Sequence, residues 1–374
     1  FHAGDIQYSS SLLSMQPSEV GDDYRTAAFL ESCARQNISK KDVLTTIKGF
    51  KNVNVAIIGD SIVDQFIACD ALGMSAEAPV IVVRELESKK FIGGGAIVAA
   101  HAQALGANCS FISVVGDDDN AGWLEEALRE QNIVCHLFRD NSRPTTFKTR
   151  YMVEQQKMFR VSRLKEHNIS ASIEKLVRDK IENIAPNTDA IIISDFVYGL
   201  LSPSLVQFVT EFAAKKNFLL FGDIQCSTQR GSLLKFKGFD TLFPTEREAR
   251  VALDSNDGGL EWLANQIIEK TGSQRLVLKL GSQGFVTYEK NNDDFVRREH
   301  FPALISNPVD VSGAGDSLMA AFVLSLISSG NAMVASAIAA SVAAISVSQV
   351  GNQPISIRQL TKIVEKEWGD YGEA

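Results

Sequence analysis

The chain has 374 residues, enough for one large α/β domain or two smaller ones, and 45% of them are hydrophobic, which is ample for a packed core. Its net charge of −8 at pH 7 argues against non-specific binding to nucleic-acid backbones, and no apolar run reaches the length of a membrane-spanning helix. The five cysteines are odd in number and form no C-x-x-C pair, which indicates free thiols, so we expect a soluble cytoplasmic protein.

Residues 1–50 differ from the rest of the chain in composition. They are polar, begin with a serine-rich stretch (YSSS at 8–11), and predict two short helices, one near 24–36 and one from about residue 40. We interpret them as an N-terminal extension, either a linker or the tail of a preceding domain.

Strands and helices alternate from residue 53 onward. Short β-branched runs ending in turn residues predict strands, and amphipathic stretches between them predict helices. Such alternation is typical of a mostly parallel sheet with helices on both faces, in which ligands bind beyond the carboxyl ends of the strands. The predicted strands occupy 54–60, 109–117, 189–196, 217–224 and 275–284.

Two stretches do not fit this alternation. Residues 78–92 and 143–164 are extended and half polar, and they predict a small β lid with strands near 62–92 and 143–164. We expect one domain over 51–362 with this lid, followed by a C-terminal tail over 363–374.

Three features could carry chemistry. The sequence DVSGAGD (310–316) places Asp316 behind Gly313-Ala314-Gly315, so that a carboxylate lies in the first turn of a helix beside unshielded amides. Asp316 could instead be an ordinary helix cap. The glycines at 93–95 either let a ligand approach the backbone or make a tight turn, and Asp64 could bind sugar hydroxyls or belong to a turn. The chain has neither a G-x-G-x-x-G fingerprint nor a phosphate-binding P-loop.

The order of these motifs resembles the ribokinase-like (PfkB) carbohydrate kinases over about residues 52–362. The motifs that carry the resemblance are GDSIVD (59–64), GGG (93–95), GDDDNAG (116–122), KLGSQG (279–284) and DVSGAGD (310–316). The segments MSAEAPVIVV (74–83) and FKTRYMVEQQKMFR (147–160) are similar to those of D-glycero-β-D-manno-heptose 7-phosphate kinases. The resemblance implies a ribokinase-like α/β fold, ATP and Mg²⁺ as cofactors, and a small-molecule sugar or sugar phosphate as the substrate.

The resemblance also implies a role for each matching residue. Asp316 would be the general base, and the amides of Gly313, Ala314 and Gly315 would stabilise charge on the transferring phosphoryl group. The remaining assignments are Asp64, Gly94, Gly95 and Lys148 for the sugar, Arg150 and Arg160 for a phosphate that it already carries, Lys279, Gly281, Gly284, Asp223 and Ser341 for the nucleotide, and Glu248 for Mg²⁺. The basic lid residues could equally be solvated surface charges.

Several positions depart from the family pattern. Ile97, Thr245 and Ser341 each stand where an asparagine is expected, and Tyr198 and Gln225 each stand where a lysine is expected. Three hypotheses follow. The first, which the intact DVSGAGD favours, is an active sugar kinase, with a heptose 7-phosphate converted to the 1,7-bisphosphate as the best candidate. The second, favoured by the lost lysines, is a degenerate kinase fold that binds without turnover. The third is another ribokinase-fold small-molecule kinase, which the lid sequence opposes.

The resemblance extends to partners. It implies a homodimer formed through the lid strands. DIQYSSSLLS (5–14) also resembles the end of cytidylyltransferase domains that are fused to heptose kinases, although an ordinary linker would have the same composition. A fused or partner nucleotidyltransferase domain is therefore one expectation for the N-terminal side.

Overall fold

The computed structural model describes residues 17–154, 156–225, 232–291 and 296–368. Within these ranges the main sheet has nine strands in the order β13-β12-β11-β10-β9-β8-β1-β4-β5. The strands from β11 to β5 in this order pair in parallel, and β12 and β13 add an antiparallel edge. The strands are β1 (Asn54–Gly59), β4 (Asn108–Val115), β5 (Val134–Arg139), β8 (Ala190–Asp195), β9 (Leu219–Ile224), β10 (Thr241–Leu242), β11 (Arg275–Lys279), β12 (Phe285–Lys290) and β13 (Val296–Phe301).

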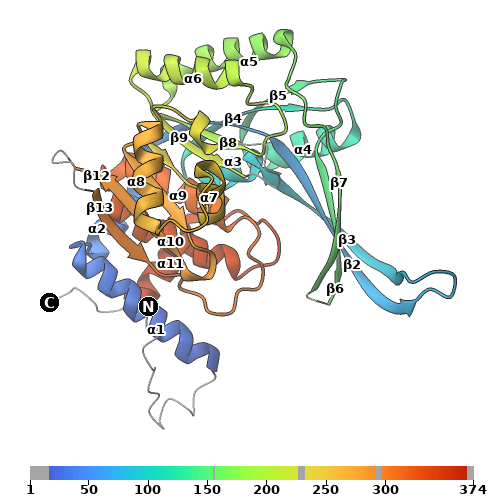
Figure 1. Ribbon diagram of the computed structural model, residues 1–374, viewed down its shortest axis with the longest axis horizontal. Coiled ribbons are helices and arrows are strands. Elements are labelled where there is room, and N and C mark those ends of the chain that lie inside the picture. The colour runs from blue at the N-terminus through green and yellow to red at the C-terminus, as the bar shows by residue number, and fades with distance from the viewer. Residues whose placement is uncertain (1–16, 155, 226–231, 292–295, 369–374) are drawn as a thin grey trace.

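Helices cover both faces of this sheet (Figure 1). One hydrophobic core packs α1, α2, α3, α4, α9, α10 and α11 against it, and a second core packs α5, α6, α7 and α8 on the other side. The predicted α/β fold class is therefore confirmed. The helices are α1 (Pro17–Arg35), α2 (Lys40–Gly49), α3 (Gly95–Ala104), α4 (Asp119–Glu130), α5 (Ala171–Ile184), α6 (Pro203–Lys216), α7 (Glu246–Leu253), α8 (Leu260–Thr271), α9 (Ala314–Ser329), α10 (Ala332–Val347) and α11 (Ile357–Trp368).

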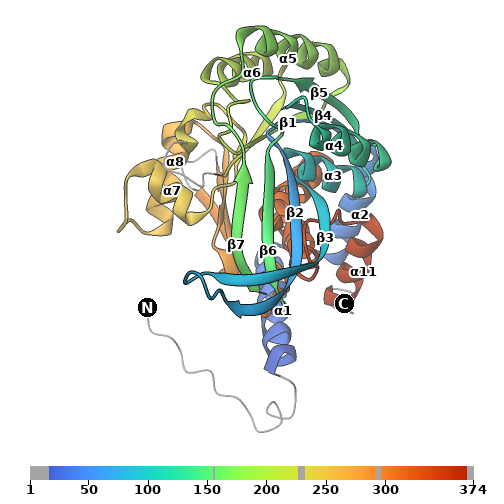
Figure 2. The ribbon, with the colours of Figure 1, turned by 90° about the vertical axis from the view of Figure 1, so that its right-hand side faces the viewer.

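A second, four-stranded sheet forms the lid, in the order β3-β2-β6-β7. Its strands are β2 (Ser61–Met74), β3 (Ile81–Gly94), β6 (Phe147–Val153) and β7 (Gln156–Arg163). The last three lie largely in the segments 78–92 and 143–164 that were predicted to be extended, and β2 precedes the first of these segments. Figure 2 shows these strands side by side, and the β2–β3 hairpin reaches well beyond the body of the molecule in Figure 1.

Helices near both ends of the chain pack on the main sheet. Phe29 of α1 and Ile47 of α2 are buried in the core, so these helices pack on the domain. Helix α11 continues past residue 362 because Val364 and Trp368 are buried, and the Trp368 ring lies edge-on to Phe29 at 6.1 Å. The stretch 5–14 and the tail residues 369–374 lie outside the described residues.

Four of the cysteines, Cys33, Cys69, Cys109 and Cys135, are free thiols, and Cys226 lies outside the described residues. In the part of the chain that the structure describes, no helix combines the length and the apolar character that crossing a bilayer requires.

Candidate active site

A cavity of about 770 Å³ lies between the lid, the carboxyl ends of the main strands and the start of α9. Most of the residues singled out from the sequence line it, namely Asp64, Gly94, Lys148, Arg150, Arg160, Glu248, Lys279, Gly281, Gly284, Gly313, Ala314, Gly315 and Asp316. The chain thus brings residues more than 200 positions apart in sequence into one cavity. Three predicted residues, Gly95, Asp223 and Ser341, do not line it.

The glycine turn before α9 is fixed by its surroundings. Gly313 is the N-cap of α9 with φ of 77°, a left-handed conformation, and a Cβ there would lie 2.0 Å from Oδ1 of Asn352. A Cβ on Gly315 would lie 3.2 Å from Nζ of Lys279. The lack of a side chain at 315 therefore lets a cation lie directly against the first turn of the helix.

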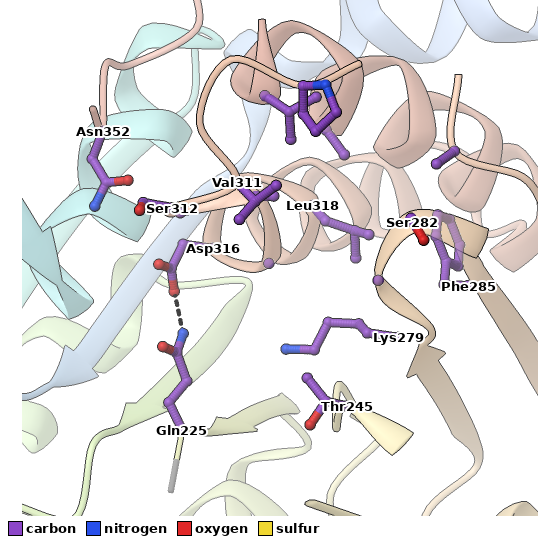
Figure 3. Close-up of a pocket in the computed structure, with 18 of the residues that line it drawn as sticks. Gln225, Thr245, Lys279, Ser282, Phe285, Val311, Ser312, Asp316, Leu318 and Asn352 are labelled. Carbon is purple, nitrogen blue, oxygen red and sulfur yellow. Dashed lines mark hydrogen bonds between the residues drawn. The ribbon is translucent and has the colours of Figure 1, made fainter. Parts of the chain in front are cut away.

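Asp316 is a buried carboxylate inside the first turn of α9, and no side chain caps this helix. The capping alternative is therefore wrong. Its Oδ1 accepts a hydrogen bond from Nε2 of Gln225 at 2.8 Å, and Figure 3 shows the two side chains pointing toward one another. Burial raises the pKa of Asp316 to about 7, helped by repulsion from Asp223, while Lys279 and the Gln225 hydrogen bond act in the opposite direction. A carboxyl group with this pKa can accept a proton near neutral pH.

Lys279 is held by the carboxylate of Asp223, which does not line the cavity. Its Nζ donates to both oxygens of Asp223 at 2.9 Å, and Asp223 is fully buried. Burial acts to lower the pKa of Lys279, but the carboxylates of Asp223 and Glu248 outweigh it and the pKa is raised. Asp223 does not line the cavity, but it positions two side chains that do, the ammonium of Lys279 and the amide of Gln225, whose Nε2 lies 3.4 Å from its Oδ2.

Glu248 lies close to this pair and lines the cavity. One oxygen, Oε2, accepts a hydrogen bond from the amide of Thr245 at 2.8 Å in the capping box of α7. Burial raises the pKa of Glu248, and Lys279 opposes the shift. Magnesium typically takes one or two carboxylates and leaves its other positions to phosphate oxygens and water. Glu248 fits that role with its second oxygen, and within the described residues no cluster of three or more acidic, histidine or cysteine side chains offers a fuller cage.

The lid presents a cationic face to the other end of the cavity. Strand register places Asp64 opposite Lys148, and Arg150 opposite Arg160. Because Lys148 and Arg150 are two residues apart on one strand, their side chains share a face of the sheet. Arg150 pairs with Asp64, which leaves Lys148 and Arg160 as additional cations on this wall.

Lys148 is held by aromatic rings. Its Nζ lies 5.2 Å from the ring centroids of both Phe196 and Tyr198, within the range of cation–π attraction. Burial lowers the pKa of Lys148 to about 8. Tyr198 stands where the resemblance expects a lysine, and the ammonium of Lys148 on the lid strand β6 lies over its ring.

A further lid residue, which the sequence did not single out, contacts the loop that precedes α9. Nζ of Lys157 on β7 donates to Oδ1 of Asp310 and to Oγ of Ser312, both at 2.9 Å. The lid is therefore tied to the loop that precedes Asp316. The contact of Gln225 with Asp316 was also not predicted, because in the sequence Gln225 is notable only as a position where the family has a lysine.

The three predicted residues that do not line the cavity have other partners. Oγ of Ser341 bonds to Oε2 of Glu367 at 3.0 Å on α11, whereas Ala340, one position earlier on α10, faces the cavity. Successive helix positions point in different directions, so this single-residue offset turns Ser341 away from the cavity. The amide of Gly95 donates to the carbonyl of Asp60 at 2.8 Å, which places Gly95 behind Gly94 at the start of α3.

Solved structures with this fold include two kinases. Phosphofructokinase-2 from Escherichia coli superposes with a TM-score of 0.70 at 16% identity over 84% of this chain and 99% of its own. Ribokinase from Thermotoga maritima superposes with a TM-score of 0.66 at 21% identity, also over 84% of this chain and 99% of its own. These similarities establish a ribokinase-like fold.

Sequence comparison makes the assignment more specific. The model of the pfkB family carbohydrate kinases matches residues 53–359, and the chain belongs to this family. It is therefore a phosphotransferase with an alcohol group as acceptor, a carbohydrate kinase that acts on a small molecule with ATP as the donor its family implies.

Curated relatives carry the name "Bifunctional protein HldE". The one from Pelobacter propionicus is 27% identical over 331 residues, covering 87% of this chain and 66% of the relative. The one from Helicobacter hepaticus is 30% identical over 306 residues, covering 81% and 62%. The chain thus spans about two thirds of the length of these relatives.

Proposed function

We propose that the protein transfers the γ-phosphate of ATP to a hydroxyl of a sugar phosphate, with D-glycero-D-manno-heptose 7-phosphate as the best candidate and the 1,7-bisphosphate as its product. The observation that carries this proposal is one cavity with Asp316, the glycine turn and Lys279 at its centre and a cationic lid face at its end. The similarity to HldE proteins supports the heptose as the sugar.

The lid cations favour an acceptor that is already phosphorylated. Lys148 and Arg160 line the cavity near the Asp64–Arg150 pair. A guanidinium group suits phosphate oxygens because its donors form a planar fork. Asp64 retains carboxylate oxygens that can accept hydrogen bonds from sugar hydroxyls, so this wall would bind both parts of a sugar phosphate.

Transfer requires the acceptor hydroxyl between Asp316 and the terminal phosphate of ATP. The hydroxyl proton passes to a carboxylate oxygen of Asp316 as the hydroxyl oxygen forms a bond to the γ-phosphorus. The bond from that phosphorus to the bridging oxygen breaks, and ADP leaves with the electron pair. The amides of the glycine turn and the ammonium of Lys279 stabilise the negative charge on the transferring group without reorganising. Mg²⁺ held beside Glu248 would neutralise the nucleotide phosphates.

The missing family lysines do not leave this cavity without positive charge. Lys148, Arg150, Arg160 and Lys279 all line it. Their presence favours an active kinase over a degenerate fold that binds without turnover.

The test measures ATP consumption and product formation over a panel of free and phosphorylated sugars that includes a heptose 7-phosphate. Turnover on one sugar phosphate, lost in Asp316→Asn, is the expected result. A folded protein that binds nucleotide or sugar but turns over no member of the panel would favour the binding-only alternative.

We further propose that the folded kinase unit includes α1 and α11, that it pairs with a second copy through the lid, and that it works beside a nucleotidyltransferase domain. Leu72, Ile81, Leu86 and Phe159 on the lid strands are more than half exposed, and a second lid would cover such side chains. The names of the relatives support a second activity in the same protein. Light scattering of wild-type protein and of Leu86→Lys would test the pairing, because a monomeric wild type would exclude it.

A further inference from the structure

Helix α1 lies before the span that the family model matches, which begins at residue 53. Its described residues nevertheless run along the strand and loops at the edge of the cavity. Ser32 donates to the carbonyl of His300 at 2.8 Å, and Arg35 bonds to Glu299 at 2.9 Å, both on β13. The start of α1 therefore lies beyond the end of β13, beside the segment that follows it.

Arg25 on α1 binds two cavity loops at once. Its Nη1 donates to the carbonyls of Ser282 and Ala303, each at 2.9 Å, and lies 3.5 Å from that of Ile305. All three of these residues line the cavity. Ser282 belongs to the short turn between β11 and β12, and the other two follow β13. One guanidinium group thus holds together three carbonyl dipoles that would repel one another without a cation.

Asp22 binds the same segment as a hydrogen-bond acceptor, whereas Arg25 binds it as a donor. Its Oδ1 accepts a hydrogen bond from the amide of Ser306 at 2.7 Å. Phe29 adds an apolar anchor, because its ring lies 6.4 Å from that of Phe301, which stacks at 5.7 Å on Phe285 in the cavity wall. The hydrogen bonds of two charged side chains and the packing of three aromatic rings therefore connect α1 to one end of the cavity.

We propose that α1 is a strap that shapes the nucleotide end of the cavity, with Arg25 and Asp22 as positioning residues. This inference rests on the proposed function and on the family resemblance, which implies that Gly281 and Gly284 lie beside the nucleotide. Gly284 packs so closely that a Cβ would lie 2.1 Å from the carbonyl oxygen of Phe301, so the two loops form one packed unit. By holding the loops 281–284 and 302–306, Arg25 sets their distance from Lys279 and the glycine turn, and this distance determines the affinity for the nucleotide.

The test compares ADP binding by wild type, Arg25→Ala and Asp22→Ala, using titration calorimetry on the whole chain. Alanine preserves the helix, since it has the highest helix propensity. The expected result is a Kd for ADP that rises roughly tenfold in Arg25→Ala, with the Kd for the sugar phosphate unchanged. Arg25→Lys should recover part of the loss, because an ammonium can donate to some of the same carbonyls. Tyr24→Ala is the matched control, since Tyr24 is 67% exposed on the same helix.

Hydrogen exchange separates a positioning role from a general loss of stability. Without ligand, Arg25→Ala should exchange faster in 281–284 and 302–306 while the amides of α9 keep their protection. If wild type binds ADP and Arg25→Ala binds it equally well, the strap is wrong and the proposed function stands. If wild type binds no ADP at all, the proposed function fails and the strap with it. A melting temperature that falls together with faster exchange over the whole chain would also overturn the positioning role.

Discussion

The ion pair between Lys279 and Asp223 offers a stringent test, because stability and activity should respond differently to its removal. The Lys279 side chain is 11% exposed and Asp223 is fully buried, with both carboxylate oxygens 2.9 Å from the ammonium. Lys279→Met would leave a charged carboxylate buried without its partner. Removing one member of a buried pair costs about 3–5 kcal/mol, and we expect the free energy of unfolding to fall by that amount.

Neutralising the partner should restore stability but not chemistry. In Lys279→Met/Asp223→Asn the fully buried carboxylate that paired with Lys279 is neutral as well, so most of the lost free energy should return in urea unfolding at pH 8. Turnover should stay about 10²–10³-fold below wild type in both variants, because the cation beside Gly315 is absent from each. Two results would refute this reasoning. One is a double variant as unstable as the single one, and the other is a double variant that regains turnover in the coupled ATP assay.

Three more predictions concern Asp316, Gln225 and the C-terminal helix. Burial raises the pKa of Asp316 from 3.8 to about 7, so its contribution to stability is full below pH 3.8 and is lost as the pH rises through 7. The free energy of unfolding of Asp316→Asn should therefore exceed that of wild type by on the order of 2–4 kcal/mol at pH 8 and equal it near pH 4, which urea titrations at both pH values would show. The kcat/KM of wild type should rise as the pH passes 7, because the general base must be deprotonated. Gln225→Leu removes a donor that lowers the pKa of Asp316, so the acid limb of the pH–rate profile should move to higher pH, and an unmoved limb would contradict the contact. Trp368→Ala should cost about 3–5 kcal/mol in thermal or urea unfolding, whereas Trp262→Ala, at a side chain 46% exposed, should cost less than about 1 kcal/mol.

Much of the fold could be predicted from local patterns. Buried parallel strands such as β1 are continuous apolar runs, and the amphipathic helices between them repeat at helical spacing. Helix α11 carried such a signal too, since Leu360, Val364 and Trp368 recur every four residues.

The candidate site was predictable only where a motif carried it. The glycine turn and Asp316 are contiguous, so a short stretch of sequence contains them. Ser341 could not be oriented, because α10 is small and apolar on every side and has no polar face to fix its rotation. Contacts such as Arg25 with Ser282 join positions 257 residues apart and follow from tertiary packing, which leaves no local trace.

The cavity is assembled from nearly the whole chain, since its lining residues run from Ile62 to Asn352. No fragment that stops short of this range can form it, so the site exists only after the main sheet, the lid and α9 have all come together. Occupancy and global folding are therefore thermodynamically linked. A compound that fills the cavity at a hundred times its Kd would raise the unfolding free energy of the whole domain by about 2.7 kcal/mol. The molecule's own melting curve can thus rank candidate sugars and nucleotides before any phosphate has been transferred.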